Sequence, residues 1–181
     1  MKVLISGAGG LLGKAVQEKL RNETIEVNRL VRVKDSKSCC DYYWEPYNEK
    51  ITESAFDGVD AVINLSGENI AGYWTESKKK KIRESRTKTT SFLSQKISHL
   101  ENPPKIFISA SAIGYYGNRG DELLNESSKF GTGFFPDVCR EWEAATAPAT
   151  AKGIRVVNLR MGIVLSEKGG ALTKMLLPFK F

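Results

Sequence analysis

The chain carries a glycine-rich stretch near its N-terminus whose spacing suits phosphate binding. It reads Gly7-Ala8-Gly9-Gly10-Leu11-Leu12-Gly13 and lies between a short apolar run, Lys2–Ser6, and a segment with apolar residues at helical spacing. In such a turn Gly7 permits the sharp reversal, Gly10 lets the backbone approach a pyrophosphate, and Gly13 lets the helix pack against the strand. The helix N-terminus, at Leu11 and Leu12, adds free N–H groups and a partial positive charge. The stretch predicts a dinucleotide-binding turn; the alternative is a tight turn that binds nothing.

The end of the second predicted strand bears on which dinucleotide would bind. An acidic residue about 20 positions beyond the glycines usually takes the ribose hydroxyls of NAD. Here that place is occupied by Arg32, while Asp35 comes too late in the loop. The planar guanidinium of Arg32 could pair with a 2′-phosphate, which a carboxylate would repel. We therefore expect NADP rather than NAD, with an ordinary loop cation as the alternative interpretation of Arg32.

Few residues are suited to metal binding or to histidine-dependent catalysis. His99 is the sole histidine, and the three cysteines are Cys39, Cys40 and Cys139, without Cys-x-x-Cys or zinc spacing. We expect no metal site. Such cysteine use is typical of a reducing compartment, so we expect a cytoplasmic protein.

The composition is that of a globular domain, with 41% hydrophobic and 27% charged residues. No run approaches the roughly 18 apolar residues of a membrane span, and the N-terminal apolar run is too short for a signal peptide. The net charge of +6 is concentrated in one segment that lacks interleaved aromatic residues. It comprises Lys78, Lys79, Lys80, Lys81, Arg83, Arg86 and Lys88. We interpret it as the solvated face of a helix rather than a nucleic-acid surface.

Strand and helix patterns alternate along the chain. This alternation would place the glycine turn at the edge of a parallel sheet, between a strand and the helix that follows it. The predicted strands are Lys2–Ser6, Ile25–Val31, Tyr42–Trp44, Ala61–Leu65, Lys105–Ser109 and Ile154–Leu159. The predicted helices are Leu11–Asn22, Thr75–Leu100 and Phe135–Lys152, the last ended or kinked by Pro148, with a helical turn at Ile51–Phe56. This order predicts an α/β protein with a three-layer Rossmann fold, a doubly wound parallel sheet with helices on both faces.

Several later motifs make the sequence resemble a particular group of proteins. The glycine spacing is similar to that of extended short-chain dehydrogenases/reductases. The match narrows with Asn64-Leu65-Ser66-Gly67-Glu68-Asn69-Ile70, Glu84-Ser85-Arg86, Ser109-Ala110-Ser111-Ala112-Ile113-Gly114-Tyr115-Tyr116-Gly117, Trp142-Glu143-Ala144-Ala145 and Leu159-Arg160-Met161-Gly162. Together they resemble the atypical "epimerase family" proteins, often labelled sugar-nucleotide epimerases or cell-division inhibitors.

The resemblance implies roles for individual residues. Ser111 falls at the catalytic serine position, after the strand that carries Ala110. Arg86 falls where ordinary relatives have an active-site asparagine, and an arginine there could reach the cofactor instead. The resemblance also places Leu65, Ser66 and Gly67 beside the cofactor, and Arg160 and Gly162 near the nicotinamide.

The catalytic Tyr-x-x-x-Lys pair of ordinary relatives is missing. Alignment on Glu143 puts Phe135 at the tyrosine position and Cys139 at the lysine position. Phenylalanine cannot transfer a proton, and a thiol cannot supply the positive charge of lysine. Tyr115 and Tyr116 could supply a phenol, although packing around the loop is the simpler interpretation, and we expect Cys139 to be a buried packing residue. Glu122 and Glu126 in the loop stay open as acids or surface residues.

Residues 1–168 are expected to form the NAD(P)-binding domain, and residues 169–181 the start of a C-terminal substrate-binding region that is cut short. Exposed apolar residues there could favour a homo-oligomer. Two functions stay open: an NADP-dependent epimerase or oxidoreductase acting on a small molecule such as a sugar nucleotide, and a non-catalytic NADPH-binding regulatory or scaffold module.

Overall fold

The computed structural model describes residues 1–33, 38–176 and 179, and its main feature is a seven-stranded sheet. The strand order is β4-β3-β2-β1-β5-β6-β7, and every pairing is parallel except that of β3 with the edge strand β4. The strands are β1 (Lys2–Ser6), β2 (Glu26–Val31), β3 (Asp41–Glu45), β4 (Lys50–Ile51), β5 (Ala61–Asn64), β6 (Ile106–Ala112) and β7 (Arg155–Met161). The order reverses between β1 and β5, which gives the doubly wound topology that the sequence predicts.

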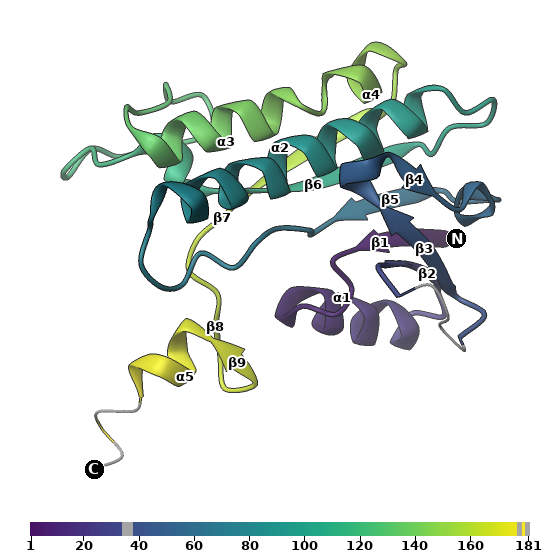
Figure 1. The fold of residues 1–181 in the computed structure, drawn as a ribbon, viewed down its shortest axis with the longest axis horizontal. Helices are drawn as coiled ribbons and strands as arrows, with labels where there is room; N and C mark the ends of the chain where they lie inside the picture. The colour runs from purple at the N-terminus through teal and green to yellow at the C-terminus, as the bar shows by residue number, and fades with distance from the viewer. Residues whose placement is uncertain (34–37, 177–178, 180–181) are drawn as a thin grey trace.

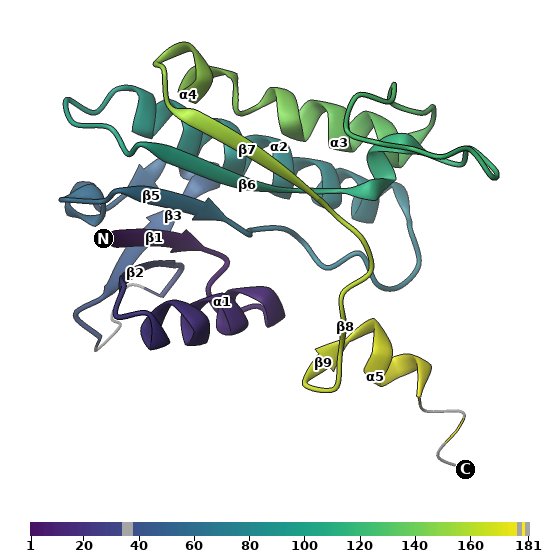
Figure 2. The ribbon, with the colours of Figure 1, turned by 180° about the vertical axis from the view of Figure 1, so that it is seen from behind.

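Helices cover both faces of this sheet, as Figures 1 and 2 show. One face carries α1 (Leu11–Asn22), and the other carries α2 (Glu76–Ser98), α3 (Phe134–Ala144) and α4 (Ala147–Ala151). The larger core lies under α2, where Leu93, Ile97 and Phe107 are fully buried. A smaller cluster around Val3 and Ile5 packs under α1. The three-layer Rossmann prediction is confirmed.

Local sequence signals explain where the long helices begin and end. Thr75 caps α2, since its hydroxyl accepts a hydrogen bond from the Lys78 backbone N–H at 3.2 Å. Pro148 lacks a backbone N–H and stands in the first turn of α4, so the predicted helix Phe135–Lys152 is divided into α3 and α4. The predicted turn at Ile51–Phe56 forms β4 and a 3₁₀ turn, η2 (Glu53–Phe56).

The last part of the chain lies outside the sheet, next to the N-terminal end of α1 (Figures 1 and 2). Strands β8 (Leu165–Ser166) and β9 (Gly169–Gly170) pair as a hairpin, followed by α5 (Ala171–Met175). The hairpin spans the predicted domain boundary at residue 168, and Gly170 approaches the Leu11 side chain. No helix within the described ranges is long and apolar enough to cross a membrane.

Candidate functional site

Two turns meet where the strand order reverses, at the carboxyl ends of β1 and β5. Gly7 follows β1 with a φ of +72°, and a Cβ built on it would lie 2.6 Å from the Leu65 carbonyl carbon and oxygen. That separation is shorter than any real side chain allows, so the turn after β1 and the turn after β5 touch only because Gly7 has no side chain. Ligands of open parallel sheets bind in the crevice at such a point.

The N-terminus of α1 points into the same crevice. A Cβ on Gly13 would lie 2.4 Å from the Gly7 carbonyl oxygen, so this glycine allows the helix to start directly against the turn. The Gly10 N–H donates to the Gly7 carbonyl at 3.0 Å, which closes the turn. The next three amides, those of Leu11, Leu12 and Gly13, have no intrahelical acceptor, because the ladder starts with the Lys14 N–H donating to the Gly10 carbonyl at 3.0 Å. Since α1 has no acidic residue in its first turn, its dipole is uncompensated and favours an anion such as a pyrophosphate.

A cleft of about 800 Å³ runs from this turn across the carboxyl edge of the sheet. Near the ends of β5 and β6 it meets a narrower space of about 240 Å³, which we call the inner recess. Among the sequence-predicted residues, the cleft is lined by Gly7, Gly10, Leu11, Leu12, Gly13, Leu65 and Arg86. The inner recess is lined by Leu12, Leu65, Ser66, Gly67, Arg86, Ala110 and Ser111. The structure therefore brings these predicted residues together around one continuous space.

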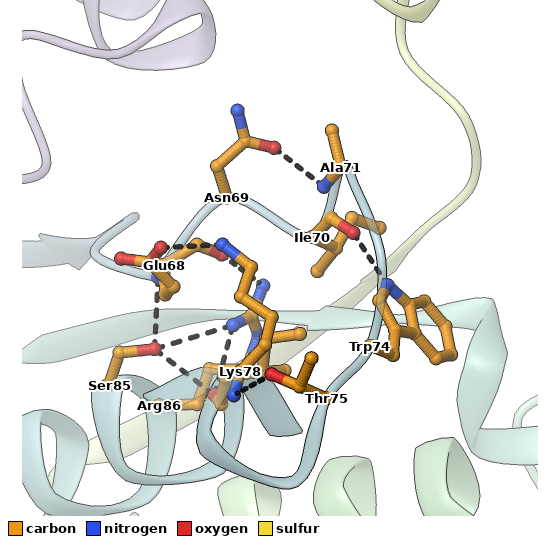
Figure 3. A network of polar contacts seen from close by, with 10 residues as sticks. Glu68, Asn69, Ile70, Ala71, Trp74, Thr75, Lys78, Ser85 and Arg86 are labelled. Atoms are coloured by element: carbon orange, nitrogen blue, oxygen red, sulfur yellow. Dashed lines mark hydrogen bonds and ion pairs between the residues drawn. The ribbon is translucent and has the colours of Figure 1, made fainter. Parts of the chain in front are cut away.

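Arg86 is the cation of the inner recess, and the turn after β5 holds it in place (Figure 3). Its guanidinium donates to the Ile82 carbonyl at 3.0 Å and to the Glu68 carbonyl at 3.1 Å. It also lies 5.2 Å from the centre of the Trp142 ring. Burial lowers the pKa of Arg86 from its ordinary value, although an arginine stays protonated. A fixed, partly desolvated positive charge thus faces the inner recess.

The turn that holds Arg86 is itself tied to α2 at two further points. Lys78 donates to the Glu68 carboxylate at 2.7 Å, and the Glu68 N–H donates to the Ser85 hydroxyl at 2.9 Å. The hydrogen bond from Lys78 lowers the pKa of Glu68. Figure 3 shows these bonds converging on the turn from one side of α2. Of this basic segment, Arg86 thus lines the recess itself, and Lys78 holds the turn that binds Arg86.

Ser111 lies in the recess with its hydroxyl already engaged. It is 1% exposed, and its hydroxyl donates to the Glu143 carboxylate at 2.6 Å. Glu143 in turn receives two hydrogen bonds of 2.8 Å from Arg160. Arg160 donates to the Tyr116 hydroxyl at 2.9 Å, and its guanidinium carbon lies 3.5 Å from the centre of the Tyr115 ring. The ion pair with Glu143 raises the pKa of Arg160.

This arrangement restricts what Ser111 and the two tyrosines can do. A hydroxyl has one proton, and Ser111 gives it to Glu143, so toward a ligand it offers lone pairs only. Tyr116 is buried and bound to Arg160, and Tyr115 packs beneath the same guanidinium. The packing interpretation of both tyrosines fits these contacts. Ser111 as a catalytic residue remains a prediction.

The two positions where ordinary relatives carry tyrosine and lysine both face the recess from α3. Phe135 lines the cleft and the recess, and Cys139 lines the recess. Cys139 is 2% exposed, and burial raises the pKa of its thiol to about 11. It is thus a neutral packing group at physiological pH, as we expect for a buried cysteine. Glu122, by contrast, is bound to Arg119 in the exposed loop, at 2.7 Å.

Arg32 is placed differently from the other predicted residues. It is exposed directly after β2 and lies outside the cleft and the recess. A separate groove of about 530 Å³ lies along α1, lined by Gly9, Val31 and the cations Lys14 and Arg29 among others. Its lining includes the residue that precedes Arg32 and also two carboxylates, Glu18 and Asp41, of which Asp41 is ion-paired with Arg29. The sequence patterns did not single out Lys14 or Arg29.

A buried chain of hydrogen bonds joins the turns to the helices, and no local pattern predicted it. Ser6 donates to Asn64 at 2.6 Å, and Asn64 donates to the Thr90 hydroxyl at 2.8 Å. The Trp142 indole N–H donates to the same hydroxyl at 2.9 Å. The chain connects β1, β5, α2 and α3, so it fixes both turns relative to the helices. Within the described residues, no group of three or more histidine, cysteine or acidic side chains could hold a metal ion.

The fold and the site together define a protein of the Rossmann class, with a cleft at the strand reversal where such folds bind dinucleotides. The chain belongs to the NAD dependent epimerase/dehydratase family, whose model matches residues 3–177. Among its relatives, an epimerase family protein of Mycobacterium leprae is 38% identical over 180 residues, which cover 99% of this chain. Human epimerase family protein SDR39U1 is 33% identical over 184 residues.

Solved structures agree with this assignment. The nucleoside-diphosphate sugar epimerase of Corynebacterium glutamicum superimposes with a TM-score of 0.86 at 38% identity, covering 99% of this chain and 38% of that one. Human SDR39U1, solved with NADPH, gives a TM-score of 0.85 at 32% identity, covering 99% and 60%. The chain spans 58% of the Mycobacterium leprae relative and 60% of human SDR39U1.

Proposed function

We propose that the cleft binds NADP(H), in preference to NAD(H), as the cofactor of an epimerase or oxidoreductase. The observation that carries this proposal is the contact between the two turns at the strand reversal, which Gly7 permits because it has no side chain. It leaves the N-terminus of α1 open toward a cleft of about 800 Å³. That volume lies in the range of small-molecule sites. The NADPH bound to human SDR39U1 supports the same assignment.

Each part of the cleft would hold a different part of the dinucleotide. The amides of Leu11 and Leu12 would bind the pyrophosphate, and Arg86 the nicotinamide end. Arg32, exposed directly after β2, would take the 2′-phosphate. NADP(H) would supply hydride chemistry when bound, and the residues of the chain would position it and exclude water.

The residues that line the recess also favour a second function, that of a non-catalytic NADPH-binding module. Phe135 cannot transfer a proton, Ser111 donates to Glu143, and Cys139 stays protonated. A module that binds NADPH and changes its affinity for a partner, without turnover, would need none of these groups. Linkage then requires the partner to change the NADPH affinity by the same factor. A partner whose affinity ignores the nucleotide would contradict that alternative.

The substrate or partner that we propose is not a nucleic acid. Much of the lysine run is paired: Lys78 with Glu68, Lys79 with Glu76 and Lys88 with Glu84. Such pairing reduces the positive field that nonspecific binding to phosphate backbones requires. We propose a small molecule as the substrate. We also propose a cytoplasmic location, because all three cysteines are free thiols.

The test is a titration of the purified chain with NADPH and with NADH, followed by nicotinamide fluorescence. We expect tighter binding of NADPH. Arg32→Ala should weaken NADPH at least about tenfold, a loss of 1.4 kcal/mol or more, and leave NADH unchanged. Lys19→Ala is the matched control, because Lys19 is an exposed cation of α1 paired with Glu23.

Each outcome has a distinct meaning. Binding of NADPH with no effect of Arg32→Ala would keep the cofactor site and remove the assigned role of Arg32. Equal affinity for the two nucleotides would refute the NADP preference. Absence of binding of either nucleotide to the folded chain would refute the proposed function.

A further inference from the structure

An aromatic cluster stands at the mouth of the inner recess. Trp74, in the loop before α2, packs edge-on against Phe135 with ring centres 4.5 Å apart, and lies 6.2 Å from Phe134. The rings of Phe134 and Phe135 are 5.6 Å apart. The Trp74 indole N–H donates to the Ile70 carbonyl at 2.8 Å, which fixes the orientation of its ring (Figure 3). Since Phe135 and Ile70 line both spaces, this cluster continues the wall of the site.

The cluster is open to solvent on its outer side. Trp74 is 40% exposed although its ring is held in place. An oriented indole that keeps this much apolar surface in water can accept another ring in an edge-on or offset-stacked contact. Tyr73, its neighbour, is 96% exposed and makes no ring contact among the described residues, so exposure alone does not define the surface.

Two cations border the aromatic cluster. The Lys79 ammonium lies 6.0 Å and the Arg83 guanidinium carbon 5.7 Å from the centre of the Phe134 ring. Lys79 is paired with Glu76 at 2.8 Å, and Arg83 is 3.5 Å from Glu141. These pairs are between partly exposed side chains and are worth little, so an incoming anion can compete for the cations.

The recess behind the cluster offers a ligand little proton chemistry. Its polar side chains include Ser111, which donates to Glu143, Cys139, whose pKa is about 11, and the permanently charged Arg86. When a simple carbonyl is reduced, the negative charge collects on one oxygen, and a proton donor of the protein lowers the barrier. A conjugated ring system spreads the added charge over many atoms and can be protonated by water.

We propose that this site takes a planar conjugated ring system bearing an anionic group. The ring would lie against Trp74 and Phe135, and the anion beside Lys79 and Arg83. This assignment rests on the proposed function, because the ring would then lie at the nicotinamide end of the cleft. Flavin mononucleotide is the probe: it has a flat conjugated ring and a phosphate.

The experiment measures binding to the chain saturated with NADP⁺, which is oxidised and so gives no turnover. Flavin mononucleotide is titrated while its anisotropy and the protein tryptophan fluorescence are recorded. We expect Trp74→Leu to weaken the flavin at least tenfold, and Tyr73→Leu, its matched control, to change affinity less than twofold. The double variant Lys79→Gln/Arg83→Gln should weaken flavin mononucleotide at least fivefold but leave riboflavin, which lacks the phosphate, unchanged. Lys80→Gln is the control on the same helix.

Besides an absence of flavin binding, three results would overturn the inference. In the first, Trp74→Leu leaves the affinity for flavin mononucleotide unchanged. In the second, the Lys79→Gln/Arg83→Gln variant weakens flavin mononucleotide and riboflavin equally. In the third, UDP-glucose binds more tightly than flavin mononucleotide. The NADPH titration keeps this test separate from the proposed function. Intact NADPH binding without flavin binding sinks the ring assignment alone, whereas loss of NADPH binding sinks the proposed function first.

Discussion

The ion pair between Glu143 and Arg160 offers the sharpest test of how the site is held together. It joins α3 to β7 through two hydrogen bonds of 2.8 Å, and Glu143 also accepts the Ser111 hydroxyl at 2.6 Å. The side chains of Arg160 and Glu143 are 18% and 14% exposed. Glu143→Leu would leave a largely buried guanidinium that keeps two of its hydrogen-bond acceptors, the Tyr116 hydroxyl and the Glu126 carbonyl, and its contact with the Tyr115 ring, but no carboxylate.

The expected cost follows from those contacts. Removing one partner of a buried ion pair costs about 3–5 kcal/mol, and the residual exposure of both side chains reduces this to about 2–4 kcal/mol. Arg160→Met should cost a similar amount, since it leaves the carboxylate unpaired. The double variant should cost clearly less than the sum, because neither charge then remains, with a coupling of about 2 kcal/mol.

The assay is urea unfolding followed by tryptophan fluorescence and circular dichroism. Glu141→Leu is the matched control: it stands on the same helix, 3.5 Å from Arg83, in a pair 39–43% exposed. We expect it to cost less than about 1 kcal/mol. A cost below about 1 kcal/mol for Glu143→Leu, or strict additivity in the double variant, would refute the claim that this pair holds α3 against β7.

Three further variants test other parts of the structure. Gly13→Ala places a Cβ 2.4 Å from the Gly7 carbonyl oxygen, so α1 must shift. We expect the unfolding free energy to fall by about 1–3 kcal/mol and NADPH to bind at least tenfold more weakly. An unchanged NADPH affinity would contradict the interpretation that Gly13 allows α1 to start against the turn. Burial raises the pKa of the Cys139 thiol from 9.0 to about 11, so the contribution of this thiol to stability is intact below pH 9 and is lost as the pH rises toward 11. The difference in unfolding free energy between the wild type and Cys139→Ala should therefore change by about 2–3 kcal/mol over that interval. Parallel pH profiles of the two proteins would count against this burial effect. Thr75→Ala removes the hydroxyl that accepts from the Lys78 N–H and should lower the unfolding free energy by about 0.5–2 kcal/mol, which a denaturant titration detects.

Those features of the fold that depend on neighbouring residues could be predicted from the sequence. The glycine turn, the strand-helix alternation, the Thr75 cap and the break at Pro148 each follow from residues within one turn or strand. The short antiparallel strand β4 was expected as part of a helical turn, because two residues carry no periodicity. Its pairing with β3 comes from the edge of the sheet, where no further parallel strand competes.

The chemistry of the site depends on contacts between distant segments, and there the sequence patterns are weak. The resemblance implied a serine near the cofactor, and the structure places Ser111 in the recess. Its bond to Glu143 could not be foreseen, because the partner is 32 residues away on another element. The chain from Ser6 through Asn64 to Thr90 is of the same kind. Spacing predicts which residues share an edge of the sheet, but a hydrogen-bond partner also depends on the packing of helices over it.

The recess has its cation on α2 and uncharged residues on α3, and this distribution explains why the fold tolerates the absence of the Tyr-x-x-x-Lys pair. On α3, Phe135 and Cys139 contribute apolar surface where a phenol and an ammonium would otherwise be partly buried. The cation comes instead from α2, as Arg86, held by main-chain carbonyls of Ile82 and Glu68. A buried lysine ammonium at position 139 would be repelled by this guanidinium. Arg86 is therefore compatible with an uncharged residue at position 139. Replacing Cys139 with lysine alone should therefore destabilise the chain rather than restore a catalytic pair, whereas the same replacement combined with Arg86→Asn removes the repulsion.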